Sequence, residues 1–153
     1  GAAVSSAGLA LAAAADGRDW NDTVLTPHPG EAARLLSSTT AALQSDRPSA
    51  ARELSSLMPG ATVVLKGAGS LVARGGVLEG VCLAGNPGLA TAGSGDVLTG
   101  VIAAARATGE NALRAATSGV WLHATAGDRA VAEIPGKALA ASDVIEALRP
   151  YRS

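Results

Sequence analysis

The fold of this chain is decided by the stretch Gly85-Asn86-Pro87-Gly88-Leu89-Ala90-Thr91-Ala92-Gly93-Ser94-Gly95-Asp96-Val97-Leu98-Thr99-Gly100. Its glycines let the main chain approach a ligand and adopt conformations that other residues avoid. After them, Val97, Leu98, Val101 and Ile102 recur at helical spacing and predict a buried helix. The N–H groups at the start of a helix attract anions. The stretch therefore predicts a phosphate-binding loop that leads into a helix.

One carboxylate, Asp96, lies at or just inside the predicted start of this helix. The helix dipole keeps it ionised there, so that it can take a proton from a hydroxyl group. An aspartate at this position can also be a simple cap. A cap does not need the Gly93-Ser94-Gly95 approach, whereas a base beside a transferring phosphoryl group needs main-chain donors close by. Ser94 is not expected to be a hydrolase nucleophile, because Ala92 breaks the Gly-x-Ser-x-Gly pattern.

A second glycine turn, Lys66-Gly67-Ala68-Gly69-Ser70, follows the predicted strand Thr62-Val63-Val64-Leu65. A lysine at a strand end beside such a turn can hold a nucleotide phosphate, because the glycine amides can approach it. The alternative is a hairpin turn with a solvated lysine. A dinucleotide-binding fingerprint is excluded, since Gly67 and Gly69 lack a third glycine and lead into β-like sequence.

The turn Pro27-His28-Pro29-Gly30 restricts a histidine between two prolines, which limits where the imidazole can point. Fixed geometry suits a binding role, and the alternative is a structural turn histidine. Two further polar residues, His123 and Asp128, are five positions apart in a predicted helix. Because that spacing places them on different faces, we interpret both as structural.

Composition bounds the possible functions. The 153 residues, 48% of them hydrophobic and 16% charged, predict one globular domain over residues 1–153. A net charge of -1 without a basic cluster argues against nucleic-acid and membrane partners. The single cysteine, Cys82, excludes a disulfide within the chain and a cysteine-built metal site, and we expect no metal held by the protein's own side chains. Residues 7–15 are apolar but too short to span a bilayer and lack leader features, so we expect a cytoplasmic protein.

Strands that alternate with helices predict an α/β fold with a mainly parallel sheet, whose ligands bind beyond the carboxyl ends of the strands. His28 and Lys66 both occupy such positions. The expected elements are an extended run over 22–26, helices from Glu31 and over 48–57, a strand over 61–65, a hairpin of 71–73 and 77–83, helices over 96–107 and 111–132, and a last helix capped by Ser142.

Four motifs resemble, in order and spacing, the ADP/ATP-dependent NAD(P)H-hydrate dehydratases of the ribokinase-like superfamily. They are Thr26-Pro27-His28-Pro29-Gly30-Glu31, Val64-Leu65-Lys66-Gly67-Ala68-Gly69-Ser70, Gly93-Ser94-Gly95-Asp96, and Leu122-His123 followed by Ala126-Gly127-Asp128. The resemblance implies a three-layer ribokinase-like fold. It also implies a lyase of metabolite repair, in which ADP or ATP phosphorylates the ring hydroxyl of hydrated NADH or NADPH and phosphate is then eliminated.

The resemblance also implies roles for individual residues. Asp96 would be the catalytic base and touch the substrate, and His28 would contact the hydrated nicotinamide. ADP or ATP would be the co-substrate, together with Mg²⁺. The residues expected to contact the nucleotide are Lys66, Gly67, Ala68, Gly69, Ser70, Gly93, Ser94 and Gly95.

The resemblance covers only the C-terminal portion of the family's domain, and the first strands have no counterpart. Ser5-Ser6-Ala7-Gly8-Leu9 stands where the family has Asp-Ala-Asp-Ala-Leu. A sheet without its first strands has an open edge, which predicts self-association into a homo-oligomer. Three functions stay open: the dehydratase, another vitamin or sugar kinase of the superfamily, and a catalytically silent nucleotide-binding module. The sequence leaves open whether the chain is a fragment, a truncated enzyme or a degenerate protein, and whether it prefers ADP or ATP and the hydrate of NADH or of NADPH.

Overall fold

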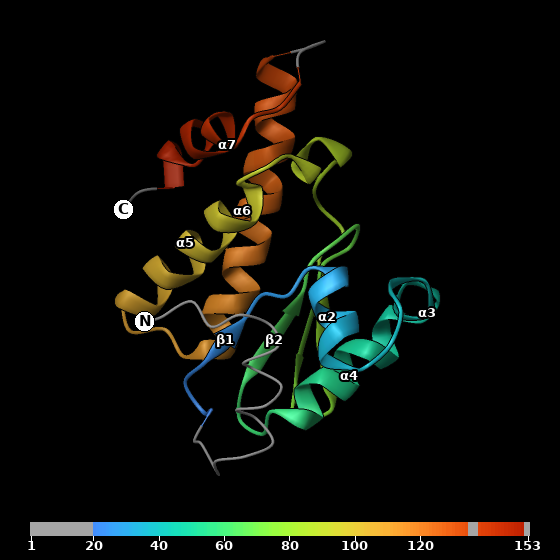
Figure 1. Cartoon of the computed structure of the whole chain (residues 1–153). Helices are drawn as coiled ribbons and strands as arrows, with labels where there is room; N and C mark the ends of the chain where they lie inside the picture. The colour runs from blue at the N-terminus through green and yellow to red at the C-terminus, as the bar shows by residue number, and fades with distance from the viewer. Residues whose placement is uncertain (1–19, 135–137, 152–153) are drawn as a thin grey trace. The chain divides into compact units, whose positions relative to one another are not determined.

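A computed structural model describes residues 20–134 and 138–151 (Figure 1). Ser5-Ser6-Ala7-Gly8-Leu9 and the rest of the apolar run 7–15 lie outside the described residues. The elements alternate as an α/β fold requires, which confirms the predicted fold class. They are β1 (Val24–Leu25), α2 (Pro29–Leu35), α3 (Thr40–Ser45), α4 (Arg47–Leu57), β2 (Thr62–Leu65), β3 (Leu71–Arg74), β4 (Val77–Val81), η1 (Pro87–Ala90), α5 (Ser94–Ala107), α6 (Ala112–Glu133), α7 (Ala141–Ala147) and η2 (Arg149–Tyr151).

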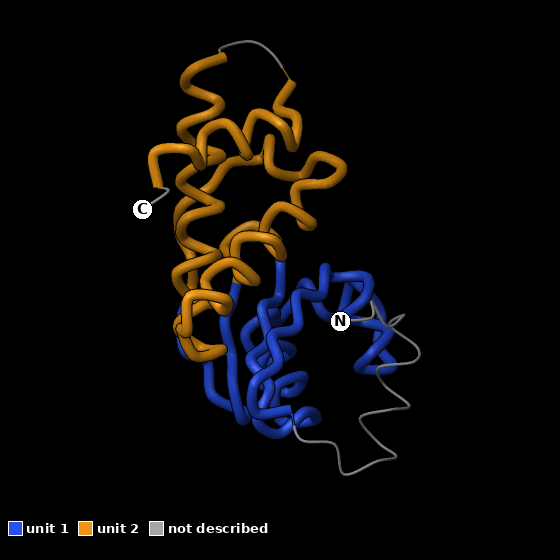
Figure 2. The backbone as a smooth tube through the Cα atoms, turned by 90° about the vertical axis from the view of Figure 1, so that its left-hand side faces the viewer, with its two compact units in different colours: residues 1–66, 71–80 blue, residues 67–70, 81–153 orange. Residues whose placement is uncertain are grey.

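Two compact units make up the chain, coloured separately in Figure 2. The first comprises residues 1–66 and 71–80 and carries the sheet with α2, α3 and α4; the second comprises residues 67–70 and 81–153 and carries η1, α5, α6, α7 and η2. The expectation that residues 1–153 form one domain stays a prediction.

The sheet has the order β1-β2-β3-β4. β1 runs parallel to β2, with Val24 opposite Thr62, and β2 runs antiparallel to β3. β3 and β4 are joined by Gly75 and Gly76, whose φ angles of 57° and 82° suit a tight hairpin turn. The described sheet is therefore mixed, whereas the sequence predicted a mainly parallel one. A parallel pair needs a long crossover, and among the described strands only the connection from β1 to β2 supplies one.

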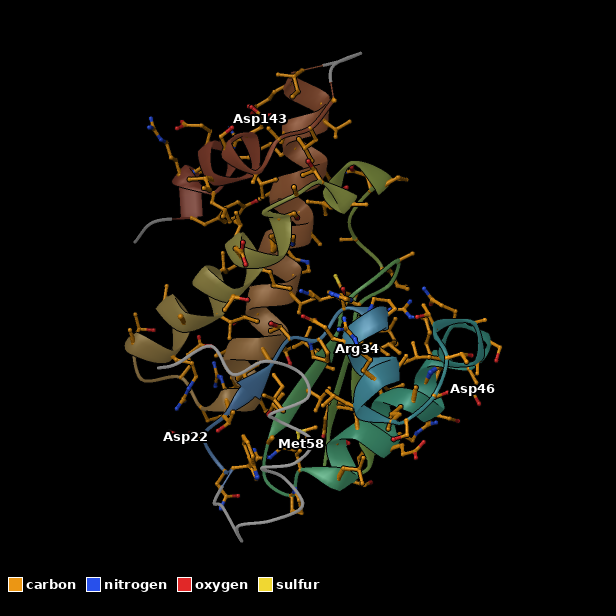
Figure 3. The ribbon with its side chains drawn as sticks, viewed as in Figure 1. Asp22, Arg34, Asp46, Met58 and Asp143 are labelled. Atoms are coloured by element: carbon orange, nitrogen blue, oxygen red, sulfur yellow. The ribbon has the colours of Figure 1, made fainter. Side chains whose placement is uncertain are left out.

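The core of the first unit lies between α4 and one face of the sheet. Leu54 and Met58 are buried against Val63 and Leu65, and Met58 is labelled in Figure 3. β2 is buried along its whole length, which explains the uninterrupted run of β-branched and apolar residues in that strand.

The core of the second unit is built on α6, whose buried face consists largely of alanine and glycine. A Cβ on Gly119 would lie 2.6 Å from Cγ1 of Ile102, so α5 and α6 approach closely at this point. A cluster of buried residues packs α7 against the C-terminal half of α6 and is made of Ala126, Ala130, Leu139, Val144 and Ala147. Within the described ranges, none of the helices combines the length and the apolar character of a bilayer-crossing segment.

Helix starts are where the structure departs from the predicted boundaries. α5 begins at Ser94, two residues before the predicted start, because Gly93 takes a left-handed conformation with φ of 82° and forms the N-cap. α7 begins at Ala141, and Ala140 occupies the N-cap position predicted for Ser142. The carboxylate of Asp143 instead accepts a 2.8 Å hydrogen bond from the Ala140 N–H. α3 was not predicted.

Candidate active site

In the first unit, the parallel strands β1 and β2 bring two predicted site residues to the same edge of the sheet. The pairing continues one residue beyond β2, where the Lys66 N–H donates a 3.0 Å hydrogen bond to the carbonyl oxygen of Pro27. His28 follows Pro27 directly. The sequence predicted that both residues follow the carboxyl ends of strands, and in a parallel pair these ends meet at one edge of the sheet.

His28 is the N-cap of α2. Its Nδ1 accepts hydrogen bonds from the N–H groups of Gly30 and Glu31, at 3.1 and 3.2 Å, while Oε2 of Glu31 accepts one from the His28 N–H at 2.8 Å. This reciprocal pair is a capping box with histidine in place of serine or threonine. The structural role that the sequence left as an alternative is therefore real. The signal for this cap in the sequence is Glu31, three residues after the polar residue His28.

The cap also fixes the chemistry of the imidazole. Because Nδ1 accepts two hydrogen bonds, the neutral ring carries its proton on Nε2. That atom lies 3.6 Å from Oε1 of Glu31, and half of the His28 side chain is exposed. His28 can thus cap α2 and still present an N–H donor at the surface.

Arg47, the first residue of α4, was missed by sequence reasoning. Its Nη2 donates hydrogen bonds of 3.3 Å to the carbonyl oxygens of both Leu65 and Lys66. Burial lowers the pKa of Arg47, yet a guanidinium stays protonated at neutral pH. A second positive charge therefore supports the end of β2. Nothing in the local sequence distinguishes Arg47 from a surface arginine at a helix start.

The turn Gly67–Ser70 belongs to the second unit. Gly67 and Gly69 have φ angles of 141° and 65°, which side chains rarely allow. The Ser70 hydroxyl donates to the Gly67 carbonyl oxygen at 3.3 Å, and the Ser70 carbonyl oxygen accepts from the Cys82 N–H at 2.9 Å. The two glycines allow this tight turn, and its contact with a nucleotide stays a prediction.

The loop before α5 delivers Asp96. The carbonyl oxygen of Gly93 accepts hydrogen bonds from the N–H groups of Asp96 and Val97, at 3.0 and 3.1 Å. The Ser94 N–H donates a hydrogen bond of 3.3 Å to the carbonyl oxygen of Thr91. This leaves the Gly95 N–H of the turn without an acceptor among the described residues. Asp96 lies in the first turn of α5 and is exposed. Two consecutive residues at the helix start therefore offer a main-chain donor, from Gly95, and an exposed carboxylate, from Asp96.

The side chain of Ser94 faces α6. It is buried, and its Oγ lies 3.1 Å from Nε2 of His123. The prediction that Ser94 contacts the nucleotide thus concerns its main chain only. His123 and Asp128, which we interpreted as structural, both hydrogen-bond to residues of the loop before Asp96. No group of three His, Cys, Asp or Glu side chains that could hold a metal ion occurs in the described part of the chain.

A family model described as NAD(P)H-hydrate dehydratase matches residues 5–150. An ADP-dependent (S)-NAD(P)H-hydrate dehydratase of Neisseria meningitidis is 50% identical over 111 residues, which are 72% of this chain and 37% of the relative. A bifunctional NAD(P)H-hydrate repair enzyme of Vibrio cholerae is 47% identical over 126 residues, 82% of this chain and 25% of the relative.

Solved structures give the same result for the fold. The Bacillus subtilis ADP/ATP-dependent NAD(P)H-hydrate dehydratase, co-crystallised with ATP and Mg²⁺, matches with a TM-score of 0.77 at 30% identity. The match covers 83% of this chain and 46% of that one. A ribokinase-like superfamily protein of Enterococcus faecalis matches with a TM-score of 0.78 at 25% identity, over 95% of this chain and 49% of that one. The chain thus spans less than half the length of each of these relatives.

Proposed function

The chain belongs to the NAD(P)H-hydrate dehydratase family, and from that membership we propose that it repairs hydrated NADH or NADPH at the expense of ADP or ATP. The observation that carries the proposal is the position of Asp96. This exposed residue lies in the first turn of α5, directly after Gly95 and three residues after the left-handed Gly93. A base and an anion-stabilising donor together are what phosphoryl transfer to a hydroxyl requires.

In the proposed reaction, Asp96 takes the proton of the ring hydroxyl as that oxygen bonds to the terminal phosphorus of the nucleotide. The bond from that phosphorus to the bridging oxygen breaks, and the shortened nucleotide leaves. The ring C–O bond then breaks and inorganic phosphate departs with the bonding electrons. Loss of a proton from the neighbouring ring carbon restores the double bond of the dihydronicotinamide.

The nucleotide is assigned to the two glycine turns and to Lys66. The amides of Gly67, Ala68, Gly69, Ser70 and Gly95 are the proposed donors, the main chain of Gly93 and Ser94 lies against the same phosphates, and the ammonium group of Lys66 offsets phosphate charge. Mg²⁺ would enter with the nucleotide as part of the co-substrate and would offset phosphate charge there. His28 donates a hydrogen bond from Nε2 to the hydrated nicotinamide. A cytoplasmic location belongs to the same proposal.

The silent nucleotide-binding module remains the second candidate, because Ser5-Ser6-Ala7-Gly8-Leu9 lacks both acidic residues that the family has at this point. Hydrated NADH, incubated with the 153-residue chain, Mg²⁺ and either ADP or ATP, tests the two against each other. The dehydratase restores dihydronicotinamide absorbance only when nucleotide is present and releases one phosphate per molecule repaired. Calorimetric binding of nucleotide without turnover supports the silent module, and phosphorylation of a vitamin or sugar supports the kinase.

A further inference from the structure

The loop from Gly85 to Gly95, called the glycine loop below, is fastened at its N-terminal end by Asp128 of α6. Oδ2 of Asp128 accepts a 2.9 Å hydrogen bond from the Gly85 N–H, and Oδ1 accepts one of 2.9 Å from Nδ2 of Asn86. Both carboxylate oxygens are thus used on two consecutive loop residues. Hydrogen bonds to an ionised carboxylate are stronger than those between neutral groups.

The other end of the glycine loop is fastened by His123, about 1.4 turns earlier on α6. Its Nε2 lies 3.1 Å from the hydroxyl oxygen of Ser94, the first residue of α5. The two side chains are only 8% and 2% exposed. A buried polar pair of this kind loses free energy when one partner is removed, because the other is left without its hydrogen bond.

Between these two ends the glycine loop packs directly on the α6 main chain. Leu89 of η1 lies over Gly127, where an added Cβ would approach Cδ2 of Leu89 to 2.5 Å. A Cβ on Gly85 would lie 3.5 Å from the Ala124 side chain. Leu89 also packs on the buried cluster shared by α6 and α7. The loop therefore contacts α6 at His123, Ala124, Gly127 and Asp128.

We propose that His123 and Asp128 are positioning residues, which anchor the two ends of the glycine loop and so place Asp96 for catalysis. The catalytic part of this inference rests on the proposed function. The five-residue spacing puts the anchors roughly 140° apart around the helix axis. A loop that is held at both anchors must follow the helix surface between them. The conformational freedom of the loop at each end is therefore reduced. Misplacing a reacting group by about 1 Å can cost on the order of 10²-fold in rate.

The variants that test this are Asp128→Ala and His123→Leu. His123→Gln is the conservative partner, because its side-chain amide can still bond to the Ser94 hydroxyl. Glu133→Ala is the matched control, since Glu133 lies on the same helix and pairs with exposed Arg129 at 2.7 Å. If His123→Leu does not fold, Ser94→Ala removes the same hydrogen bond, with Ser118→Ala of α6 as its control.

Amide hydrogen exchange, measured by NMR on the full 153-residue chain, shows how firmly the loop is held and does not require an active enzyme. We expect the Gly85 N–H to exchange about tenfold faster or more in Asp128→Ala, as the loss of a charge-assisted hydrogen bond implies. Loop amides near Ser94 should exchange faster in His123→Leu and recover in His123→Gln. Unchanged exchange in folded Asp128→Ala and His123→Leu overturns the inference.

Kinetics give the second readout. We expect kcat to fall about 10²-fold in Asp128→Ala and His123→Leu with KM little changed, and Glu133→Ala to match the wild type. Faster exchange with an unchanged kcat would show that the loop is anchored but that the anchors do not place Asp96, which overturns the positioning role. If the wild-type chain has no dehydratase activity, the proposed function fails, and the exchange rates still decide whether His123 and Asp128 anchor the loop.

Discussion

The Lys66 N–H donates a 3.0 Å hydrogen bond to the carbonyl oxygen of Pro27, which joins the ends of β1 and β2 directly before the turn that holds His28. Arg47 adds two further hydrogen bonds at the same strand end, to the carbonyl oxygens of Leu65 and Lys66. The main chain around Lys66 is therefore held on both sides. Three hydrogen bonds thus fix the main chain around the residue that carries the ammonium group.

Replacing Lys66 by methionine should weaken nucleotide binding, because it removes a charge that offsets those of the phosphates. A charge-assisted hydrogen bond contributes about 1.5–3 kcal/mol, which corresponds to roughly 10- to 100-fold in affinity. Calorimetric titration of ADP and ATP measures the change. Arg52→Met is the control, since Arg52 is an exposed cation of α4. Equal dissociation constants for Lys66→Met and the wild type would remove Lys66 from the site.

Two substitutions of His28 separate its two roles. Asparagine is a strong N-cap residue, so His28→Asn should keep the stability of α2 and lose the Nε2 donor. His28→Ala should lose both, with a stability cost of about 1 kcal/mol. Thermal unfolding measures the contribution of the cap to stability, and dehydratase kinetics measure the contribution of the Nε2 donor to activity. Full activity in His28→Asn would mean that His28 serves only as a cap.

Two glycines of the same region should respond in opposite directions to alanine. Gly93 has φ of 82°, and its added Cβ would lie 3.3 Å from that of Ala141, so Gly93→Ala should destabilise the chain by about 1–2 kcal/mol. Gly100 lies within α5 and its added Cβ meets nothing within 4 Å, so Gly100→Ala should stabilise by about 0.5–1 kcal/mol. Chemical denaturation of both variants is the measurement. A neutral Gly93→Ala would contradict the left-handed N-cap.

The elements that could be predicted from the sequence are those in which local pattern and burial agree. The run Thr62–Leu65 is β-branched and apolar, and the strand is buried throughout. The apolar spacing after Gly95 is helical, and α5 follows. α3 escaped prediction because, of its six residues Thr40–Ser45, only Leu43 is buried, which leaves no periodic pattern to read.

The sequence could indicate candidate site residues only where the residues of a motif are consecutive in the chain. Asp96 after its glycines, and His28 and Lys66 at strand ends, could be picked out by motif and position. Arg47 and the contact between His123 and Ser94 could not, because they join residues that are 18 to 29 positions apart. The hairpin of β3 and β4 was expected from the sequence. That this hairpin would make the described sheet mixed was not.

We predict that the isolated chain self-associates or is only marginally stable. β1 pairs with β2 on one side, and no other described strand pairs with it. An open strand edge is a template for pairing with another chain, and a homo-oligomer is the proposed outcome. Light scattering, read beside thermal unfolding, measures both quantities. A monodisperse monomer with a sharp transition at high temperature would show that this prediction is wrong.

The central claim is that Asp96 is the base, and Asp96→Asn tests it most directly. The amide keeps the shape of the side chain but cannot accept the hydroxyl proton, so the rate of nucleotide-dependent repair of hydrated NADH should fall by about 10²- to 10⁴-fold. The dissociation constants for ADP and ATP should stay close to those of the wild type. An Asp96→Asn chain that restores dihydronicotinamide absorbance at the wild-type rate would contradict the account and place the base elsewhere.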